Sequence, residues 1–198
     1  MQTPGHAVVN LALIAGAVDP TLALPVLAGA VLPDVPIMVL YARERWLHGT
    51  PEDRIWRDHY QRPFWQNLIH GLHSIPMAAL GLVAALLLGA PAIAAFFGSA
   101  LLHALADLPI HAEDAHRQLL PFSTYRFISP LSYWDPRHHG AKVALAEASL
   151  VFAAGLYLWT GSAGPEGRVI LALVGLWYAL SYLRTFVVPA LRATLRPW

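Results

Sequence analysis

The chain has 198 residues, of which 57% are hydrophobic and 13% charged, and its formal net charge is +1. The charged fraction is about half of the ~25% usual in soluble domains, and the near-neutral charge argues against a nucleic-acid binder. The sequence has no cysteine, which excludes disulfides, thiol catalysis and cysteine zinc sites, whereas ten histidines are unusual in so apolar a chain.

Six apolar runs, rich in Ala and Leu and without period-two alternation, predict helices rather than strands. They cover residues 7–18, 22–41, 69–88, 92–110, 141–160 and 169–191. All but the short first run approach the ~20 residues that cross a membrane. We therefore predict an all-α, polytopic transmembrane bundle of five to six apolar helices in three hairpins. Residues 1–198 form one integral membrane domain, with polar cytoplasmic-side loops at 43–66 and 111–140.

The basic residues predict the orientation of this bundle. The hairpin tips fall at Asp19-Pro20, at 89–91 and at 161–167. Twelve of the 13 Lys and Arg residues, Arg196 included, fall at the opposite, open ends, and Arg168 alone lies near a tip. By the positive-inside rule both termini are expected in the cytoplasm. No positively charged segment precedes the first apolar run, so we expect that run to remain in the mature protein.

Histidine and aspartate residues from four predicted helices fall near the open ends. They are His6, Asp34, His70, His73, His103, Asp107 and His111. His103 and Asp107 are four apart and share a helix face, as do His70 and His73, three apart. Ionisable groups in membrane helices usually face the bundle interior, and imidazole with carboxylate suits zinc, manganese or iron. A lone helix histidine more often packs through a hydrogen bond, but packing histidines would scatter between both ends. We predict a centre for one or two divalent ions.

The 111–140 loop and the next helix add further candidates. The loop carries Glu113, Asp114, His116, Asp135, His138 and His139. This group either completes the metal site or lies in a solvated loop. Glu147 lies one turn inside the following helix, where it is a candidate ligand, a general base or a partner for Lys142.

Five short motifs, in this order, resemble the membrane-bound predicted metal-dependent hydrolases, a bacterial domain of unknown function. They are Gly5-His6, Leu32-Pro33-Asp34, His70-Gly71-Leu72-His73-Ser74, His103-Ala104-Leu105-Ala106-Asp107 and Pro121-Phe122-Ser123. The resemblance covers roughly residues 3 to 123. The family often has a longer spacing between the two histidines of the third motif, and His73 matches that motif best. The resemblance implies a metal-dependent hydrolase in a bacterial inner membrane.

The hydrolase hypothesis gives these residues roles. The metal ligands are His6, Asp34, His73, His103 and Asp107. A bound divalent ion, zinc first and manganese or iron as alternatives, would acidify water and polarise a carbonyl or phosphoryl oxygen. The candidates for proton transfer or a second metal are His70, His111 and Asp114, and Arg117, Arg126 and Arg137 are candidates for binding a phosphate or carboxylate. A site at the cytoplasmic interface favours a lipid or another amphiphilic ester or phosphoester.

Two alternatives remain open at this point. One is a non-enzymatic metal-binding membrane protein, either a sensor or a transporter. A transporter would need a second set of polar residues near the hairpin tips, to line an ion path on that side. The other is a partner subunit whose histidines bind a pigment or haem. Membrane lipids are the expected partners, nucleic acid is not, and small residues on the helix faces permit a homo-oligomer.

Overall fold

The computed structural model describes residues 1–16 and 19–194, and every regular element within them is helical. The predicted all-α architecture is therefore confirmed, and no strand occurs in these two ranges. Val18, at the end of the first predicted run, and Arg196 lie outside the described residues.

The first hairpin pairs a short helix with a long one. Helix α1 (Thr3–Asn10) continues into a π-helical turn, Leu11–Gly16. The returning helix runs without interruption from Pro20 to Leu47. The Asp19 side chain caps its start by accepting a hydrogen bond from the Thr21 amide. Its segments are the 3-10 turn Pro20–Leu22, α2 (Ala23–Val31), the 3-10 turn Leu32–Asp34, α3 (Val35–Ala42) and the π-helical turn Arg43–Leu47.

The second hairpin begins with a bent pair of helices. Helix α5 (Pro63–Leu72) and helix α6 (Ile75–Leu87) meet at an angle of 44°. Helix α7 (Pro91–Asp107) then returns along α6 and ends in the 3-10 turn Leu108–Ile110. The predicted polar loop before this hairpin is itself partly helical, with α4 (Glu52–Arg54) and the π-helical turn Ile55–His59.

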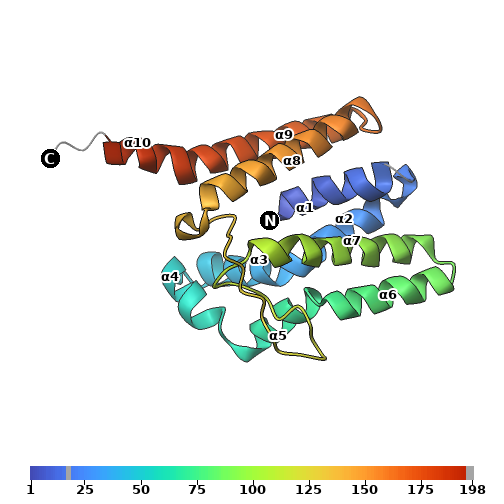
Figure 1. Ribbon diagram of the computed structural model, residues 1–198, viewed down its shortest axis with the longest axis horizontal. Coiled ribbons are helices and arrows are strands. Elements are labelled where there is room, and N and C mark those ends of the chain that lie inside the picture. The colour runs from blue at the N-terminus through green and yellow to red at the C-terminus, as the bar shows by residue number, and fades with distance from the viewer. Residues whose placement is uncertain (17–18, 195–198) are drawn as a thin grey trace.

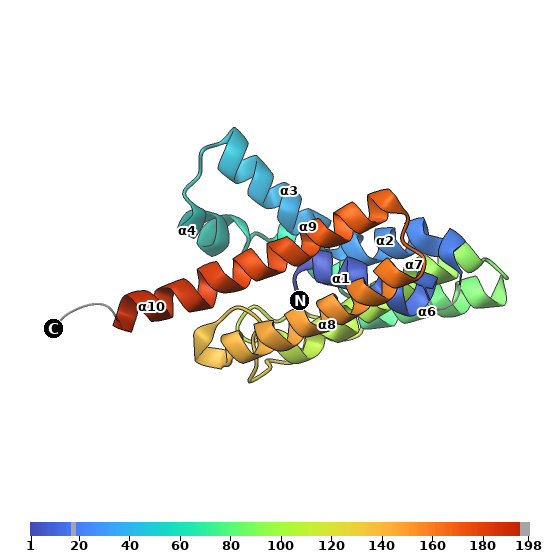
Figure 2. The ribbon, with the colours of Figure 1, turned by 90° about the horizontal axis from the view of Figure 1, so that it is seen from above.

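The third hairpin consists of two long helices that lie side by side along one flank of the bundle (Figure 1). A long irregular segment with one 3-10 turn, Pro136–His138, leads into helix α8 (Gly140–Thr160). Helix α9 (Pro165–Tyr182) returns and continues through the π-helical turn Leu183–Val187 into α10 (Val188–Thr194). Figure 2 shows α10 extending beyond the other helices.

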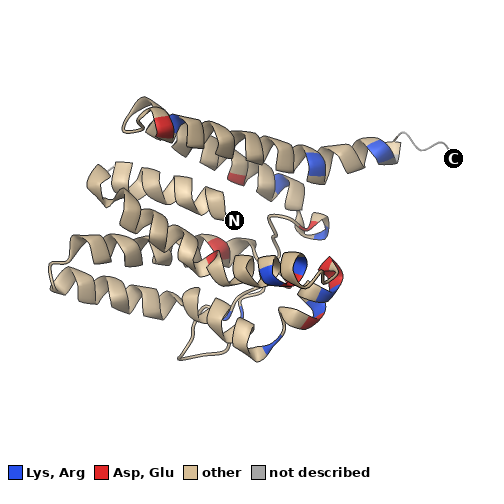
Figure 3. Cartoon of the chain, turned by 180° about the vertical axis from the view of Figure 1, so that it is seen from behind, with Lys and Arg blue, Asp and Glu red and all other residues tan. Residues whose placement is uncertain are grey.

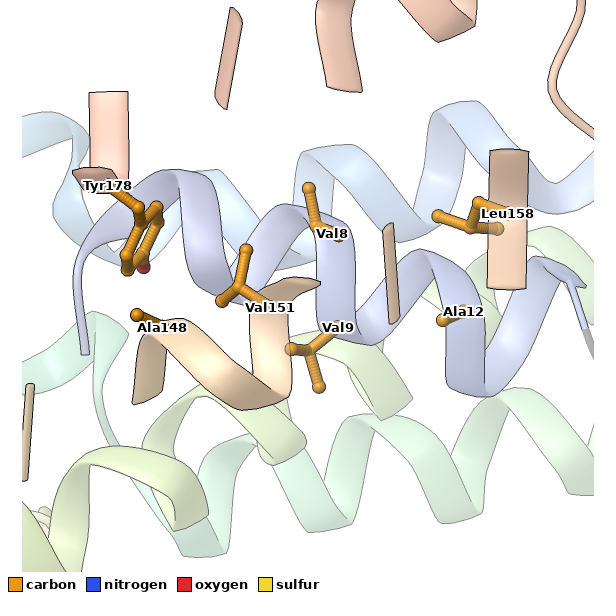
Figure 4. Packing of buried hydrophobic residues seen from close by; sticks show 7 residues of the cluster. All are labelled: Val8, Val9, Ala12, Ala148, Val151, Leu158 and Tyr178. Carbon is orange, nitrogen blue, oxygen red and sulfur yellow. The ribbon is translucent and has the colours of Figure 1, made fainter. Parts of the chain in front are cut away.

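Helix α1 lies between the α8–α9 hairpin on one side and α2 and α7 on the other (Figures 1 and 2). Val8 and Val9 of α1 and Ala12 of the π-helical turn that follows it pack against α8 and against Tyr178 of α9. Figure 4 shows Tyr178 where α1 begins and Leu158 at the opposite end of this cluster. Because α1 is covered on both sides, its first turn, which carries His6, is fixed inside the molecule.

Close contact between α2 and α7 sets the depth of the polar residues on both. Gly29 lies so near the Phe96 carbonyl and the Ser99 side chain that an added Cβ would collide with them. Ser99 donates to the Val26 carbonyl at 2.7 Å, and Asn10 of α1 donates to Ser99 Oγ at 2.9 Å. These buried hydrogen bonds hold three helices in register one turn away from His103.

Within the described residues, four helices are long and apolar enough to cross a membrane, and a fifth span results if the bent α5–α6 pair counts as one. They are Pro20–Leu47, Pro91–Ile110, Gly140–Thr160 and Pro165–Arg192. Figure 3 shows most Lys and Arg residues at the end of the bundle that holds the polar loops. The hairpin tips lie at the other end, as the sequence predicted.

Candidate metal centre

Helix α7 supplies two buried side chains to the centre. His103 and Asp107 lie on one face of its last turns, with His103 Nε2 3.3 Å from Asp107 Oδ2. Both side chains are almost completely inaccessible to solvent. The predicted pairing of these residues is therefore present in the structure.

The break between α5 and α6 positions His73. Helix α5 ends at Leu72, and Ser74 caps α6 by accepting from the Met77 amide, so His73 lies at the corner between two helices. The spacing in the sequence predicts that His70 and His73 lie on one face at the start of a single helix. That placement is wrong, because His70 lies in the last turn of α5 and the chain bends after His73.

His73 and His103 face each other through their Nε2 atoms, which are 3.2 Å apart. His73 Nδ1 lies 2.8 Å from the Ile69 carbonyl, and His103 Nδ1 lies 2.7 Å from the Ala30 carbonyl. A carbonyl oxygen can only accept a hydrogen bond, so both Nδ1 atoms carry the ring proton. In the neutral rings the two Nε2 atoms therefore direct their lone pairs to the same point. Two nitrogen ligands of a tetrahedral zinc ion are separated by a similar distance, roughly 3.3 Å.

Two further residues approach this pair from the first hairpin. Asp34, in the 3-10 turn after α2, places Oδ1 3.5 Å from His73 Nε2 and 3.6 Å from His103 Nε2. Thr3 of α1 donates its hydroxyl proton to Asp34 Oδ2 and fixes this carboxylate. His6 Nε2 lies 3.0 Å from Asp107 Oδ1, and the His6 ring stacks on the His103 ring at 3.6 Å.

The sixth member of the group, His116, comes from the long loop. Its ring stacks on His73 with centroids 4.0 Å apart, and its Nδ1 is buried without a hydrogen-bond partner among the described residues. Burial, together with the nearby His73 and His111 rings, holds the pKa of His116 well below its usual value. This residue therefore presents the neutral imidazole that binds metals.

These six side chains form three overlapping groups whose ligand atoms lie within 4.8 Å of one another. The groups are His6–His103–Asp107, Asp34–His73–His103 and His73–Asp107–His116. Buried, convergent imidazole and carboxylate groups of this kind are costly in an apolar environment unless a cation or a proton joins them. The donor set is of the kind that binds a metal ion, and it contains all five predicted ligands.

His111 and Asp114 form a dyad at the edge of the centre. His111 Nδ1 lies 2.9 Å from Asp114 Oδ2, and His111 Nε2 lies 3.5 Å from Asp107 Oδ1. Burial alone would lower the pKa of His111, but Asp107 and Asp114 outweigh it and raise that pKa to about 9. Although α7 ends before His111, the segment that follows directs this ring to Asp107.

His70 lies beside the centre and outside the three ligand groups. Its Nε2 contacts Gln66 Oε1 at 2.9 Å, and its Nδ1 accepts from the Arg117 amide at 3.3 Å. The guanidinium of Arg126 lies 3.1 Å from the same Nε2 and 3.1 Å from Gln66 Oε1. Both ring nitrogens are thus engaged, and Arg126 is a predicted anion-binding arginine whose guanidinium contacts this ring.

The remaining predicted residues lie away from the ligand groups. Arg117 donates to Asn67, and Arg137 pairs with Asp135 at 2.6 Å and with Glu113 at 3.4 Å. Because Arg137 is bonded to two carboxylates, it is less available to an anionic substrate. His138 is partly and His139 fully exposed, and His139 adopts a left-handed backbone conformation just before α8.

Glu147 is buried in α8 and, among the residues that the structure describes, bonds to neither Lys142 nor an arginine. Its Oε1 accepts from the Tyr178 hydroxyl at 2.6 Å and from the Gln2 amide at 2.8 Å. Its Oε2 is buried without a partner within the described ranges. This carboxylate therefore belongs to the contact between α8, α9 and the start of α1, outside the three ligand groups.

The sequence predicts His116 only as one of the loop residues that either complete the metal site or are solvated, and it gives no sign that Thr3 supports Asp34. His116 had one signal, its position in the dense run from His111 to His116, but a loop has no period that assigns a direction to a side chain. The Thr3-Pro4 pair is typical of the start of a helix. In the structure the residue preceding α1 is Gln2, and the Thr3 hydroxyl donates to Asp34 instead. The sequence matches no protein-family model, no curated protein and no solved structure in these comparisons.

Proposed function

We propose that this protein is an integral membrane, metal-dependent hydrolase that acts on a lipid or another amphiphilic ester or phosphoester. The observation that carries the proposal is the His73–His103 pair, whose Nε2 atoms converge at 3.2 Å while both Nδ1 atoms are committed to backbone carbonyls. Second-sphere hydrogen bonds of this kind fix the tautomer of metal-binding histidines. Zinc suits the donor set best, with manganese or iron as alternatives.

The distribution of polar groups supports a site at the cytoplasmic face of a bacterial inner membrane. The ligands and most basic residues lie at the same end of the bundle, and the positive-inside rule assigns that end to the cytoplasm. A substrate with a polar group at the interface and an apolar body in the bilayer would reach this end directly. The resemblance of five short motifs to membrane-bound predicted metal-dependent hydrolases is consistent with this assignment.

The side chains around the centre have the properties that hydrolysis requires. A divalent ion bound there polarises a carbonyl or phosphoryl oxygen and makes water a better nucleophile at neutral pH. The His111–Asp114 dyad lies beside Asp107 and can exchange a proton with the attacking water or the leaving oxygen. Arg126 presents a positive charge next to His70, where it can bind a phosphate or carboxylate.

A hydrolysis assay on detergent-purified protein tests this proposal. Short-chain phospholipids and carboxylic esters are incubated with protein loaded with zinc, manganese or iron. We expect release of the phosphoryl or acyl product, its loss with a chelator, and its loss in His103→Ala, Asp107→Ala protein. His48→Ala, which removes an exposed histidine away from the centre, should retain activity. Metal-loaded protein that hydrolyses none of these substrates would contradict the proposal.

The burial of the ligands favours a second candidate, a metal-dependent sensor without catalysis. His73, His103 and Asp107 are almost completely buried, and Asp34 has the only partly exposed side chain among the ligands, at 14%. Structural metal sites are closed, whereas catalytic sites keep an open position. A sensor would bind metal and change conformation or protease sensitivity without hydrolysing lipid.

A further inference from the structure

A cavity of about 200 Å³ lies between α8 and α9 at the polar end of the bundle. Aromatic side chains form most of its wall, namely Tyr133, Trp134, Tyr178, Tyr182 and Phe186. Trp134 and Tyr133 come from the long loop, and the other three come from α9 and the turn that follows it. The cavity therefore has an aromatic wall at the depth where lipid headgroups meet the bilayer.

An acidic side chain lies next to this cavity. Glu147 lies one turn beyond the lining residue Ala144, and it accepts hydrogen bonds from two residues of the wall, Tyr178 and Gln2. Its second oxygen, Oε2, is buried and has no donor in the described part of the chain. None of the described residues that line the cavity is a lysine or an arginine.

Aromatic faces together with an acidic group recognise organic ammonium ions. The negative face of an aromatic ring attracts a cation, and a carboxylate adds a longer-range attraction in a medium of low dielectric constant. A phosphate or carboxylate, in contrast, would meet no positive partner on this wall. The chemistry of the cavity thus selects an ammonium group and disfavours an anion.

An apolar groove of about 320 Å³ continues along the same seam toward the hairpin tip. Val151, Phe152 and Gly155 of α8 line it, opposite residues 171–172 and 174–176 of α9. Ala144 in the aromatic cavity and Val151 in the groove are seven residues apart, which is roughly 10 Å along a helix. The seam thus offers a polar cavity at the interface and an apolar channel below it.

The cavity also adjoins the candidate metal centre. Tyr133 lines the cavity, and its ring lies 5.3 Å from the ring of His111, which approaches Asp107. Trp134 donates to Asp114 at 3.0 Å, so a second wall residue contacts the His111–Asp114 dyad. Two residues of the cavity wall thus contact the His111–Asp114 dyad.

We propose that the α8–α9 seam binds a phospholipid with an ammonium headgroup, the ammonium in the aromatic cavity and one acyl chain in the apolar groove. The role of this lipid as substrate rests on the proposed function, whereas its binding does not require hydrolysis. The phosphoester of such a lipid lies between its ammonium and its acyl chains, and the cavity adjoins the dyad at that level.

Binding is measured by Trp fluorescence and native mass spectrometry on full-length protein in detergent, with a chelator present. The probes are phosphatidylethanolamine and phosphatidylglycerol with identical short chains, so that only the headgroup differs. We expect about tenfold tighter binding of phosphatidylethanolamine, since a cation over aromatic rings is worth roughly 1–2 kcal/mol. Glu147→Gln should remove most of this preference, and Tyr182→Leu should reduce it severalfold if Glu147→Gln does not fold.

Matched variants separate the parts of the proposal. Glu166→Gln removes an acidic group at the tip end of the same hairpin and should keep the preference. Gly155→Leu fills the groove, where an added Cβ meets only ordinary contacts at 3.9 Å, and should weaken both lipids equally. Equal binding of the two lipids to the wild type would overturn the proposal, even if metal-dependent hydrolysis is found. A preference that persists without any hydrolysis supports the lipid site and contradicts only the proposed enzyme.

Discussion

The two spans that contain α7 and α9, Pro91–Ile110 and Pro165–Arg192, have the same mean hydropathy of 1.6, yet they occupy different environments. A third of the most apolar window of α7 is buried, against 6% for α9. The buried face of α7 carries Ser99, His103 and Asp107, whereas α9 buries Tyr178 and exposes Leu173 and Leu176. Hydropathy therefore identifies both spans, but the spacing of polar residues tells which of them is central.

The largest effect is expected on α7 itself. His103→Ala removes the imidazole that belongs to two of the three ligand groups. We expect the affinity for zinc to fall by about 100-fold or more, since even residues that support ligands contribute 10–100-fold. Competition with a coloured chelator measures this, with His48→Ala as the control. Unchanged affinity in His103→Ala would show that α7 does not hold the ion.

The next largest effect is expected at the contact between α2 and α7. Gly29→Ala would place a methyl group against the Phe96 carbonyl and Ser99, and should destabilise the fold by about 1–3 kcal/mol. Gly98→Ala lies on α7 itself and meets only side chains at 3.8 and 3.9 Å. It should therefore be neutral or stabilising by up to about 1 kcal/mol. Thermal unfolding in detergent compares the two variants, and equal melting temperatures would contradict this account of the interface.

The support of Asp34 should have a smaller effect. Thr3→Val keeps the shape of the side chain and removes the hydroxyl that donates to Asp34 Oδ2. We expect zinc affinity to fall by roughly tenfold, at the lower end of the range for such supports. Thr21→Val, which removes an exposed threonine hydroxyl at the opposite end of the bundle, should bind zinc as the wild type does.

The pH dependence of metal binding tests the His111–Asp114 dyad. Because the pKa of His111 is raised to about 9, its ring carries a positive charge beside Asp107 at neutral pH in the metal-free protein. Zinc affinity should therefore increase as the pH rises toward 9 and His111 loses its proton. Asp114→Asn removes one cause of the raised pKa and should move this increase to lower pH by roughly half a unit to one unit. A shift to higher pH would contradict this reading.

The smallest effect is expected on the exposed face of α9. Leu173 is 60% exposed, so Leu173→Ala should change stability in detergent by less than about 0.5 kcal/mol. Thermal unfolding measures it beside Val26→Ala, which truncates a fully buried side chain under α7. If Leu173→Ala were the more damaging of the two, α9 would be packed against something other than detergent or lipid.

The sequence predicted the helices well because long apolar runs have few alternatives in a membrane protein. It also predicted five of the six candidate ligands, since His103 and Asp107 have helical spacing and the others fall at helix ends. It treated residues 69–88 as one apolar run, whereas α5 ends at Leu72 and the chain bends at His73 before Ser74 caps α6. It could not assign His116 or the seam between α8 and α9, because loop direction and helix contacts depend on tertiary packing.

The most direct test of the central claim is the metal content of the purified wild-type protein. Elemental mass spectrometry, after incubation with zinc, manganese or iron and removal of unbound ions, counts the ions per chain. The account predicts about one or two ions per chain, as the three overlapping ligand groups allow. Protein that is folded by circular dichroism and retains no ion under any of these conditions would contradict it. The converging imidazoles would then have to be joined by protons alone.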